Sequence, residues 1–102
     1  MIRHIVMFKL KELASPEEKQ AIMSEIKEGL ELLVHRIDVV RSIHVGLNIN
    51  PSESWDIVLT ADFDSLEDLS VYVDHPLHVE ISTNLIAPVK ADRACVDFYL
   101  WN

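Results

Sequence analysis

Apolar residues alternate with polar ones along four segments of the chain, which is the pattern of β-strands. These segments are residues 2–11, 39–49, 55–63 and 93–101. Residues 55–63 show the alternation most clearly, because Ile57, Leu59 and Phe63 share one side of the strand. Residues 2–11 carry apolar side chains on both sides, so we expect that strand to be covered on both faces.

A first helix is predicted from Ser15 to about Val34. Ser15 is placed as the N-cap, Pro16 as the first helical residue, and Glu18 as the partner that completes a capping box. Gly29 lies inside this helix, where glycine costs about 1 kcal/mol relative to alanine. Close packing against the sheet would explain its presence.

A second helical segment is interrupted by a proline. We expect Asp64 to cap its start, with Glu67 as the capping-box partner. The residue before a proline is disfavoured in a helix, so His75 forms a corner. Pro76 then opens a second helical piece that ends before Pro88. The side chains expected to face inward are Leu66, Leu69, Tyr72 and Val73.

The order strand, helix, strand, strand, helix, strand predicts a single α+β domain over residues 1–102. The predicted architecture is ferredoxin-like, a βαββαβ fold with a four-stranded antiparallel sheet and helices on one face. The strand over residues 55–63 is expected to pair with residues 39–49 through a short turn. The other face of the sheet is expected to hold Ile5, Met7, Val58, Tyr99 and Trp101. This face is too apolar to leave in water, so we predict a homodimer through the sheet faces.

Charge and composition narrow the classes of partner. The chain has 102 residues and a net charge of -8, which argues against nucleic acid and anionic membranes as partners. No run approaches the roughly 20 apolar residues of a membrane span, and the N-terminal stretch, broken by His4 and Lys9, is a poor signal peptide. Cys95 is the only cysteine, so no disulfide forms within the chain, which fits a cytoplasmic location. We expect Cys95 to be a small buried hydrophobe without a histidine partner.

Tyr72, His75 and His78 surround the proline corner and form the strongest candidate for chemistry. Imidazole titrates near neutrality, so His78 could act as a general base on an enolisable ligand. Tyr72 could donate a hydrogen bond to the enolate oxygen that forms. The alternative is structural, with His78 capping backbone carbonyls and Tyr72 at the edge of the core. His75 is interpreted as structural, since its side chain can bond the corner backbone.

A pocket between the sheet and the helices is expected to bind a small apolar or enolisable molecule. Its predicted lining, besides Tyr72 and His78, is His4, Val6, Phe8, Leu59 and His75. A lone histidine such as His4 on an apolar strand face is more often a core residue than a catalyst. The spacing of His75, His78 and Glu80 does not match a helical zinc site. We therefore predict no metal and no organic cofactor.

Four segments together resemble the stress-responsive A/B barrel family, also called the dimeric α/β barrel domain proteins. The segments are His4–Lys11, Gly46–Asn48 followed by a serine, Tyr72–His78 and Leu85–Phe98. Tyr72–His78, taken with the opening strand, is the most specific of them. The resemblance implies a ferredoxin-like fold and a homodimer whose two sheets close into a barrel. It implies no single reaction, since many bacterial members have none assigned.

One plant branch of this family consists of polyketide cyclases, which close a poly-β-keto chain by aldol chemistry without a metal or cofactor. That branch uses a tyrosine and the second histidine of the same motif, which correspond here to Tyr72 and His78. His4 matches a pocket histidine of the branch. The chain departs from the branch on the third strand, where Ile57 stands in place of a histidine, and in the aromatic pocket residues of the first helix.

Two functions from different classes follow from the sequence. The first is a small-molecule pocket protein, either a cofactor-free cyclase, lyase or isomerase or a relative that only binds. The second is a stress-associated structural or assembly protein with a vestigial pocket. An open cavity at the predicted lining favours the first, and side chains that fill the same space favour the second.

Overall fold

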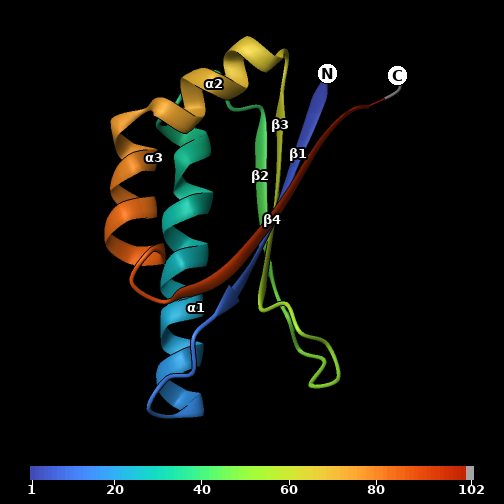
Figure 1. The fold of residues 1–102 in the computed structure, drawn as a ribbon. Helices are drawn as coiled ribbons and strands as arrows, with labels where there is room; N and C mark the ends of the chain where they lie inside the picture. The colour runs from blue at the N-terminus through green and yellow to red at the C-terminus, as the bar shows by residue number, and fades with distance from the viewer. Residues whose placement is uncertain (101–102) are drawn as a thin grey trace.

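The computed structural model describes residues 1–100 and shows one sheet with helices on one face (Figure 1). The strands are β1 (Ile2–Leu10), β2 (Ser42–Leu47), β3 (Ile57–Phe63) and β4 (Lys90–Tyr99). The helices are α1 (Pro16–Glu31), α2 (Leu66–Asp74) and α3 (Pro76–Ile81), with a 3₁₀ turn η1 (Leu32–His35) and a π-helical turn η2 (Ser82–Ile86). The sheet order is β2-β3-β1-β4 and every pair is antiparallel, so the predicted ferredoxin-like fold is confirmed.

Serine residues are the N-caps of α1 and α2. The Ser15 hydroxyl accepts a hydrogen bond from the backbone N–H of Glu18 at 3.1 Å, as predicted. At α2 the cap is Ser65, whose hydroxyl accepts from the backbone N–H of Asp68 at 3.1 Å. The prediction that Asp64 caps this helix is wrong. The Asp64 carboxylate instead accepts from Arg41 at 2.6 Å, which ties the start of α2 to the residue before β2.

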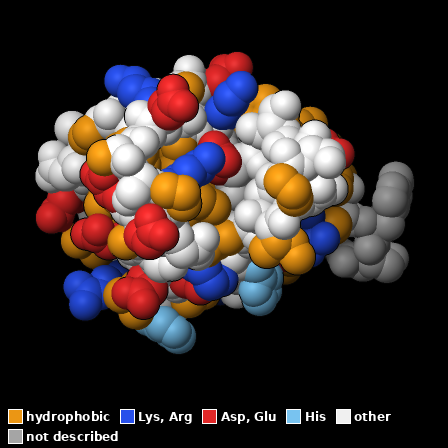
Figure 2. All heavy atoms as spheres, turned by 90° about the horizontal axis from the view of Figure 1, so that it is seen from below, with side chains coloured by type: hydrophobic (Ala, Val, Ile, Leu, Met, Phe, Trp, Pro, Cys, Tyr) orange, Lys and Arg blue, Asp and Glu red, His pale blue; other side chains and the backbone are white. Residues whose placement is uncertain are grey.

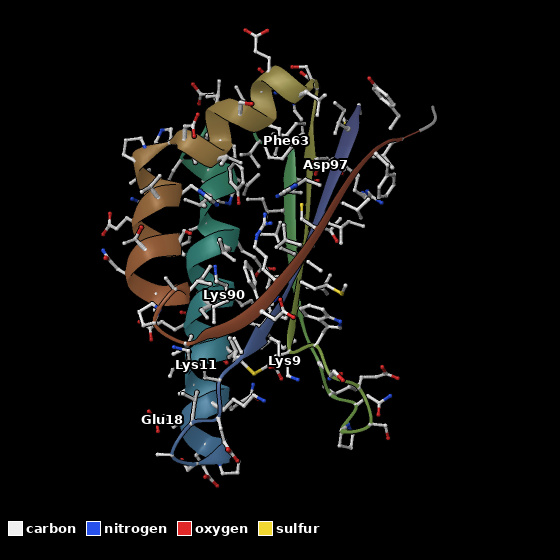
Figure 3. All side chains as sticks on the ribbon, viewed as in Figure 1. Lys9, Lys11, Glu18, Phe63, Lys90 and Asp97 are labelled. Carbon is white, nitrogen blue, oxygen red and sulfur yellow. The ribbon has the colours of Figure 1, made fainter. Side chains whose placement is uncertain are left out.

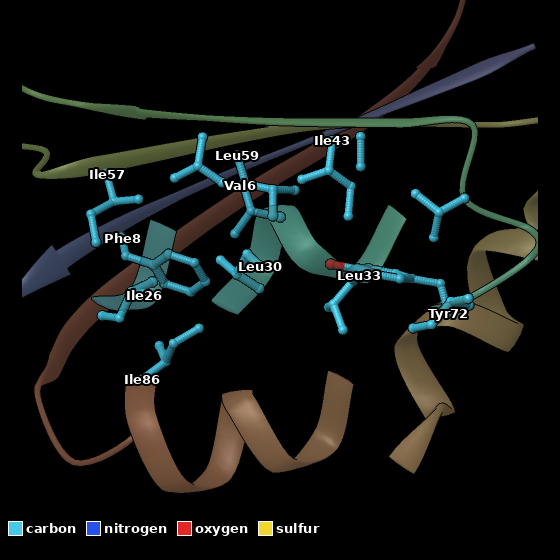
Figure 4. Close-up of a cluster of buried hydrophobic side chains, with 14 of the residues drawn as sticks. Val6, Phe8, Ile26, Leu30, Leu33, Ile43, Ile57, Leu59, Tyr72 and Ile86 are labelled. Atoms are coloured by element: carbon cyan, nitrogen blue, oxygen red, sulfur yellow. The ribbon is translucent and has the colours of Figure 1, made fainter. Parts of the chain in front are cut away.

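The core lies between α1 and the sheet, and the end of η2 closes one side of it (Figure 4). Ile26 and Leu30 of α1 pack against side chains of β1 and β3, including Val6 and Leu59. Tyr72 enters the same core from α2 and is one of its largest fully buried side chains. Leu66 and Val73 were expected to face inward, but both are exposed, because α2 buries only the side that carries Leu69 and Tyr72.

Strand β4 presents its faces the opposite way from the prediction. Tyr99 pairs with Ile2 of β1 and therefore lies on the side of the sheet that faces the helices, not on the open side. Trp101 lies outside the described residues. The apolar side of β4 faces away from the helices, because Val96 pairs with Ile5 and Phe98 with Arg3, which lie on the outer side of β1. We call the sheet surface that no helix covers the open face. Its apolar members are Ile5, Met7, Val58, Ala94, Val96 and Phe98.

The connection between β2 and β3 is longer than predicted and runs over residues 48–56. It is folded locally by Asn48, whose side chain accepts from the backbone N–H of Asn50 at 2.8 Å. Asp56 fixes its far end, since its carboxylate accepts from the backbone N–H of Leu10 at 2.7 Å and lies 2.8 Å from the Lys19 ammonium. None of the helices within residues 1–100 combines the length and the hydropathy that a membrane crossing requires.

Candidate functional site

A cavity of about 200 Å³ lies between the helices and the β1–β4 side of the sheet. Its floor comes from β1 and β3, its roof from α1, α2, α3 and η2, and its outer edge from β4. The lining residues are His4, Val6, Phe8, Leu30, Leu59, Tyr72, Val73, His78, Ser82, Ile86, Lys90 and Arg93. The open space at the predicted position distinguishes this site from a solid core.

The proline corner places Tyr72 and His78 side by side. His75 has an extended backbone conformation (φ -65°, ψ 134°), so α2 ends there and α3 begins at Pro76 in a new direction. The Nδ1 atom of His75 accepts from the backbone N–H of Leu77 at 3.1 Å and caps α3. The rings of Tyr72 and His78, on either side of the corner, have centroids 4.5 Å apart. His75 does not line the cavity, although we expected it there.

His78 is held as a neutral imidazole with one nitrogen left for a ligand. Its Nδ1 atom lies 2.9 Å from the backbone oxygen of Val73. A carbonyl oxygen can only accept, so Nδ1 carries the proton and Nε2 keeps its lone pair. Burial lowers the pKa of His78 below its usual value, and the positive charge of Arg93 acts in the same direction. The group is therefore a proton acceptor at neutral pH.

Tyr72 offers a hydroxyl to the same space. The side chain is 1% exposed, and its ring packs on Phe63 with centroids 5.1 Å apart. Figure 4 shows the hydroxyl reaching from α2 toward Leu30 and Val6. No residue in the described range forms a hydrogen bond with this hydroxyl. Every fully enclosed polar side-chain atom in that range has a partner, so the Tyr72 oxygen is not fully enclosed and instead faces the cavity. Burial raises the pKa of Tyr72, which keeps the group protonated and able to donate.

His4 is oriented by a carboxylate that the sequence did not reveal. Its Nδ1 atom lies 2.5 Å from Oδ1 of Asp97 on the neighbouring strand, and the imidazole N–H donates to that oxygen. The Sγ atom of Cys95 is 3.5 Å from the same nitrogen. Cys95 is exposed, so the prediction of a buried cysteine without a histidine partner is wrong. Asp97 and Cys95 lie on the side of β4 that the alternation pattern assigns to the open face.

His4, Cys95 and Asp97 are also the one group of three metal-ligating side chains found within residues 1–100. Their ligand atoms all lie within 4.8 Å of one another. A nitrogen, a thiolate and a carboxylate form a donor set that Zn²⁺ accepts, with one tetrahedral position left open. The short His4–Asp97 hydrogen bond accounts for the arrangement without an ion, and burial and the nearby Asp97 charge raise the pKa of the Cys95 thiol, which disfavours the thiolate.

Most of the predicted site residues meet in the cavity. His4, Val6, Phe8, Leu59, Tyr72 and His78 all line it. Six lining residues were not among those predicted from the sequence, namely Leu30, Val73, Ser82, Ile86, Lys90 and Arg93. Arg93 was missed because the two faces of β4 were assigned the wrong way round, and Lys90 was missed because β4 begins three residues before the predicted strand. Figure 3 places Lys90 near the start of β4 and Asp97 near its far end, where Asp97 contacts His4 and does not itself line the cavity.

A model of the Stress responsive A/B Barrel Domain family matches residues 2–100 of the chain. The chain belongs to this family. A curated relative, the Stress-response A/B barrel domain-containing protein At5g22580 of Arabidopsis thaliana, is 31% identical over 94 residues, which cover 85% of this chain and 76% of the relative. The family membership predicted from the four sequence segments is thereby confirmed.

Solved structures agree with the fold of this family member. A dimeric protein of unknown function and ferredoxin-like fold from Bacteroides fragilis is 44% identical, with a TM-score of 0.90 and coverage of 97% of this chain and 95% of that one. A hydroxynitrile lyase from Passiflora edulis has a TM-score of 0.73 over 95% of this chain and 90% of its own. Its identity is 16%, so this second likeness extends to the fold alone.

Proposed function

We propose that this A/B barrel domain is a homodimer whose cavity binds a small molecule and carries out acid–base chemistry without a metal or organic cofactor. In this proposal His78 is the general base and Tyr72 is the hydrogen-bond donor to an enolate. The reaction class is proton abstraction next to a carbonyl, as in a cyclase, lyase or isomerase. One observation carries the proposal: the Tyr72 hydroxyl and the neutral His78 ring both face the same cavity.

The proposed step is a proton transfer within the cavity. The Nε2 lone pair of His78 takes a proton from the carbon next to a ligand carbonyl, and the C–H electron pair forms the enolate. The negative charge develops on the carbonyl oxygen, and the Tyr72 hydroxyl donates a hydrogen bond to it. The enolate carbon then attacks a second carbonyl or takes back a proton, and His78 returns its proton. His4, oriented by Asp97, is a second donor or acceptor at the same end of the cavity.

The open face supports the proposed homodimer. Its Val96 is 55% exposed and its Phe98 is 41% exposed in the single chain. These residues share a surface with Ile5 and Met7, and such a contiguous apolar surface typically marks an interface. The Bacteroides fragilis protein, at 44% identity, is described as dimeric. A second copy laid sheet to sheet would cover the open face while leaving the cavity on the opposite side of each sheet.

The experiment that tests the chemistry is deuterium exchange into simple enolisable ketones and β-keto esters, followed by proton NMR. We expect the wild-type protein to accelerate exchange and His78→Ala to abolish the acceleration. Tyr72→Phe should lower the rate on the order of 10²-fold, since it removes one oxyanion hydrogen bond and keeps the ring. His75→Ala is the matched control, because His75 lies outside the cavity lining. Full activity in His78→Ala would overturn the assignment of the base.

The alternative is a non-catalytic binding or structural protein, and the bond between His78 and Val73 is the observation that favours it. Pro76 cannot donate a backbone hydrogen bond, so carbonyl oxygens at the end of α2 lack helical partners. His78 caps one of them at 2.9 Å. If this is its main role, His78→Ala should lower the free energy of unfolding by about 1–3 kcal/mol. A clear loss of thermal stability, together with no exchange by the wild type, would favour the alternative.

A further inference from the structure

Two cationic side chains line the cavity and no acidic side chain does. Lys90 and Arg93 both come from β4, and every other lining residue is apolar, aromatic, histidine or serine. The chain as a whole has the opposite balance, with 17 acidic residues against 9 lysines and arginines. Acidic side chains stand out over the helical, left-hand side of the molecule in the end view of Figure 2. The sign of the charge at the cavity is therefore not a consequence of composition.

Neither cation forms an ion pair with another residue of the described range, 1–100. The ion pairs of lysine and arginine within residues 1–100 use Arg3, Lys19, Lys27 and Arg41. Lys90 and Arg93 are in none of them. An unpaired cation beside a partly enclosed, largely apolar space attracts an anion more strongly than the same cation in open water.

The register of β4 turns both cations toward the cavity. Lys90 pairs with Leu10 and Arg93 pairs with Phe8, and both partners on β1 point to the helices. The register shifts between Lys9 and Leu10. This irregularity lets Lys90 and Arg93 share a face although they are an odd number of residues apart. A regular strand would have sent one of them to the open face.

We propose that the ligand of this cavity is a small organic carboxylate, with its anionic end bound by Lys90 and Arg93. Its apolar body lies along Val6, Phe8 and Ile86, which separate the cations from the far end of the site. A guanidinium matches the two oxygens of a carboxylate, and an ammonium adds a point charge. Resting on the proposed function, the inference further places a carbonyl of the ligand between Tyr72 and His78, which makes the substrate a keto acid or a related enolisable acid.

The test compares a matched pair of probes, 3-phenylpropanoate and 3-phenylpropanamide, which differ in charge at one end. Binding to the full chain is measured by isothermal titration and by NMR shifts of the histidine rings. We expect the carboxylate to bind on the order of tenfold more tightly than the amide, with an affinity that falls as salt rises. Arg93→Gln and Lys90→Gln should each weaken carboxylate binding several-fold and weaken amide binding by a smaller factor, because the amide carries no charge.

Arg36→Gln is the control, because it removes the same charge from an exposed position that does not line the cavity. Equal affinities for the two probes, equal effects of Arg36→Gln and Arg93→Gln, or no saturable carboxylate binding in the millimolar range would each overturn the inference. Carboxylate binding without any deuterium exchange would instead contradict the proposed chemistry and leave the anion site standing. Catalysis of deuterium exchange with no preference for the charged probe would overturn the anion site and leave the proposed chemistry standing.

Discussion

At the scale of single residues, His78 makes a prediction about pH. Burial lowers its pKa below the usual value of about 6.5, so the ring remains a base at a pH where an ordinary histidine is protonated. We expect the rate of deuterium exchange to be constant through neutral pH and to fall only in acid, with a midpoint below 6.5. A pH–rate profile measured with one ketone checks this. A midpoint at or above 6.5 would exclude His78, in the state described, as the base.

Gly29 gives a prediction about stability. It was expected to be required by close packing on the sheet, but its neighbours are Ile81 and Leu85 of the helical layer. A Cβ atom there would lie 3.5 Å from Cδ1 of Ile81, which is an ordinary contact. Gly29→Ala should therefore raise the free energy of unfolding by about 1 kcal/mol, the helix-propensity difference.

Thermal or denaturant unfolding measures the effect of Gly29→Ala at a fixed protein concentration. Gly46→Ala is the matched control, because its new Cβ atom would lie 3.1 Å from Cγ1 of Val58 and the neighbour would have to yield. It is expected to bring no gain. A destabilised Gly29→Ala would show that α1 and the following helices pack more tightly than these distances indicate.

The residues of the site divide by how far the sequence could locate them. Tyr72 and His78 could be predicted because a proline fixes the corner between them, which is a local effect. His4 could be placed in the cavity because it lies on the same side of β1 as the apolar residues Val6 and Phe8. Asp97 and Arg93 could not, since their position depends on the register between two strands that are distant in the sequence. Register is decided by tertiary pairing and by a bulge, neither of which leaves a local pattern.

At the scale of elements, the same reasoning explains which strand was misread. On β1 and β3 the more apolar side faces the helices, so alternation and burial agree. On β4 the apolar side is the open face, and the side toward the helices is polar because it edges a cavity. Alternation identifies two faces but not which one is covered by helices. The cap of α2 was misassigned for a simpler reason, since Asp64 and Ser65 are adjacent and both are good N-caps.

A cross-strand clamp at one end of the open face makes the prediction at this scale. The Asp62 carboxylate on β3 accepts from Arg3 of β1 at 2.9 Å and from the Ser42 hydroxyl of β2 at 2.9 Å. It therefore joins three strands. Asp62→Asn keeps the shape and removes the charge, and we expect it to lower the free energy of unfolding by about 1 kcal/mol at neutral pH.

The pH dependence of this clamp has a definite sign. The Arg3 hydrogen bond lowers the pKa of Asp62 below its usual value of about 3.9. The folded state therefore binds a proton less readily than the unfolded state, so the contribution is complete above pH 4 and is lost as the pH falls through the folded-state pKa. Denaturant unfolding at several pH values should show the wild type and Asp62→Asn converging in acid. A constant difference down to pH 2 would contradict the clamp.

At the scale of the whole molecule, the two faces of the sheet differ in what covers them. The face toward the helices forms the core over β2, β3 and β1, and it leaves the cavity where β4 extends beyond the helical cover. No helix within residues 1–100 covers the open face, which carries apolar residues at the centre of β1, β3 and β4. Because successive residues of β4 serve the two faces in turn, Cys95 and Val96 are neighbours in sequence but belong to different surfaces.

This separation makes the proposed dimer testable without disturbing the cavity. Val96 lies on the open face, opposite Ile5 of β1, and is 55% exposed in the single chain. Val96→Glu places an unpaired charge in the proposed interface, where burying it is strongly unfavourable. Light scattering at micromolar concentration should return twice the chain mass for the wild type and the mass of one chain for the variant, and Met7→Glu should act in the same way. Cys95→Ser, one residue away on the cavity side, should remain dimeric. A monomeric wild type, or a Val96→Glu variant that is folded and still dimeric, would show that the open face is not the interface.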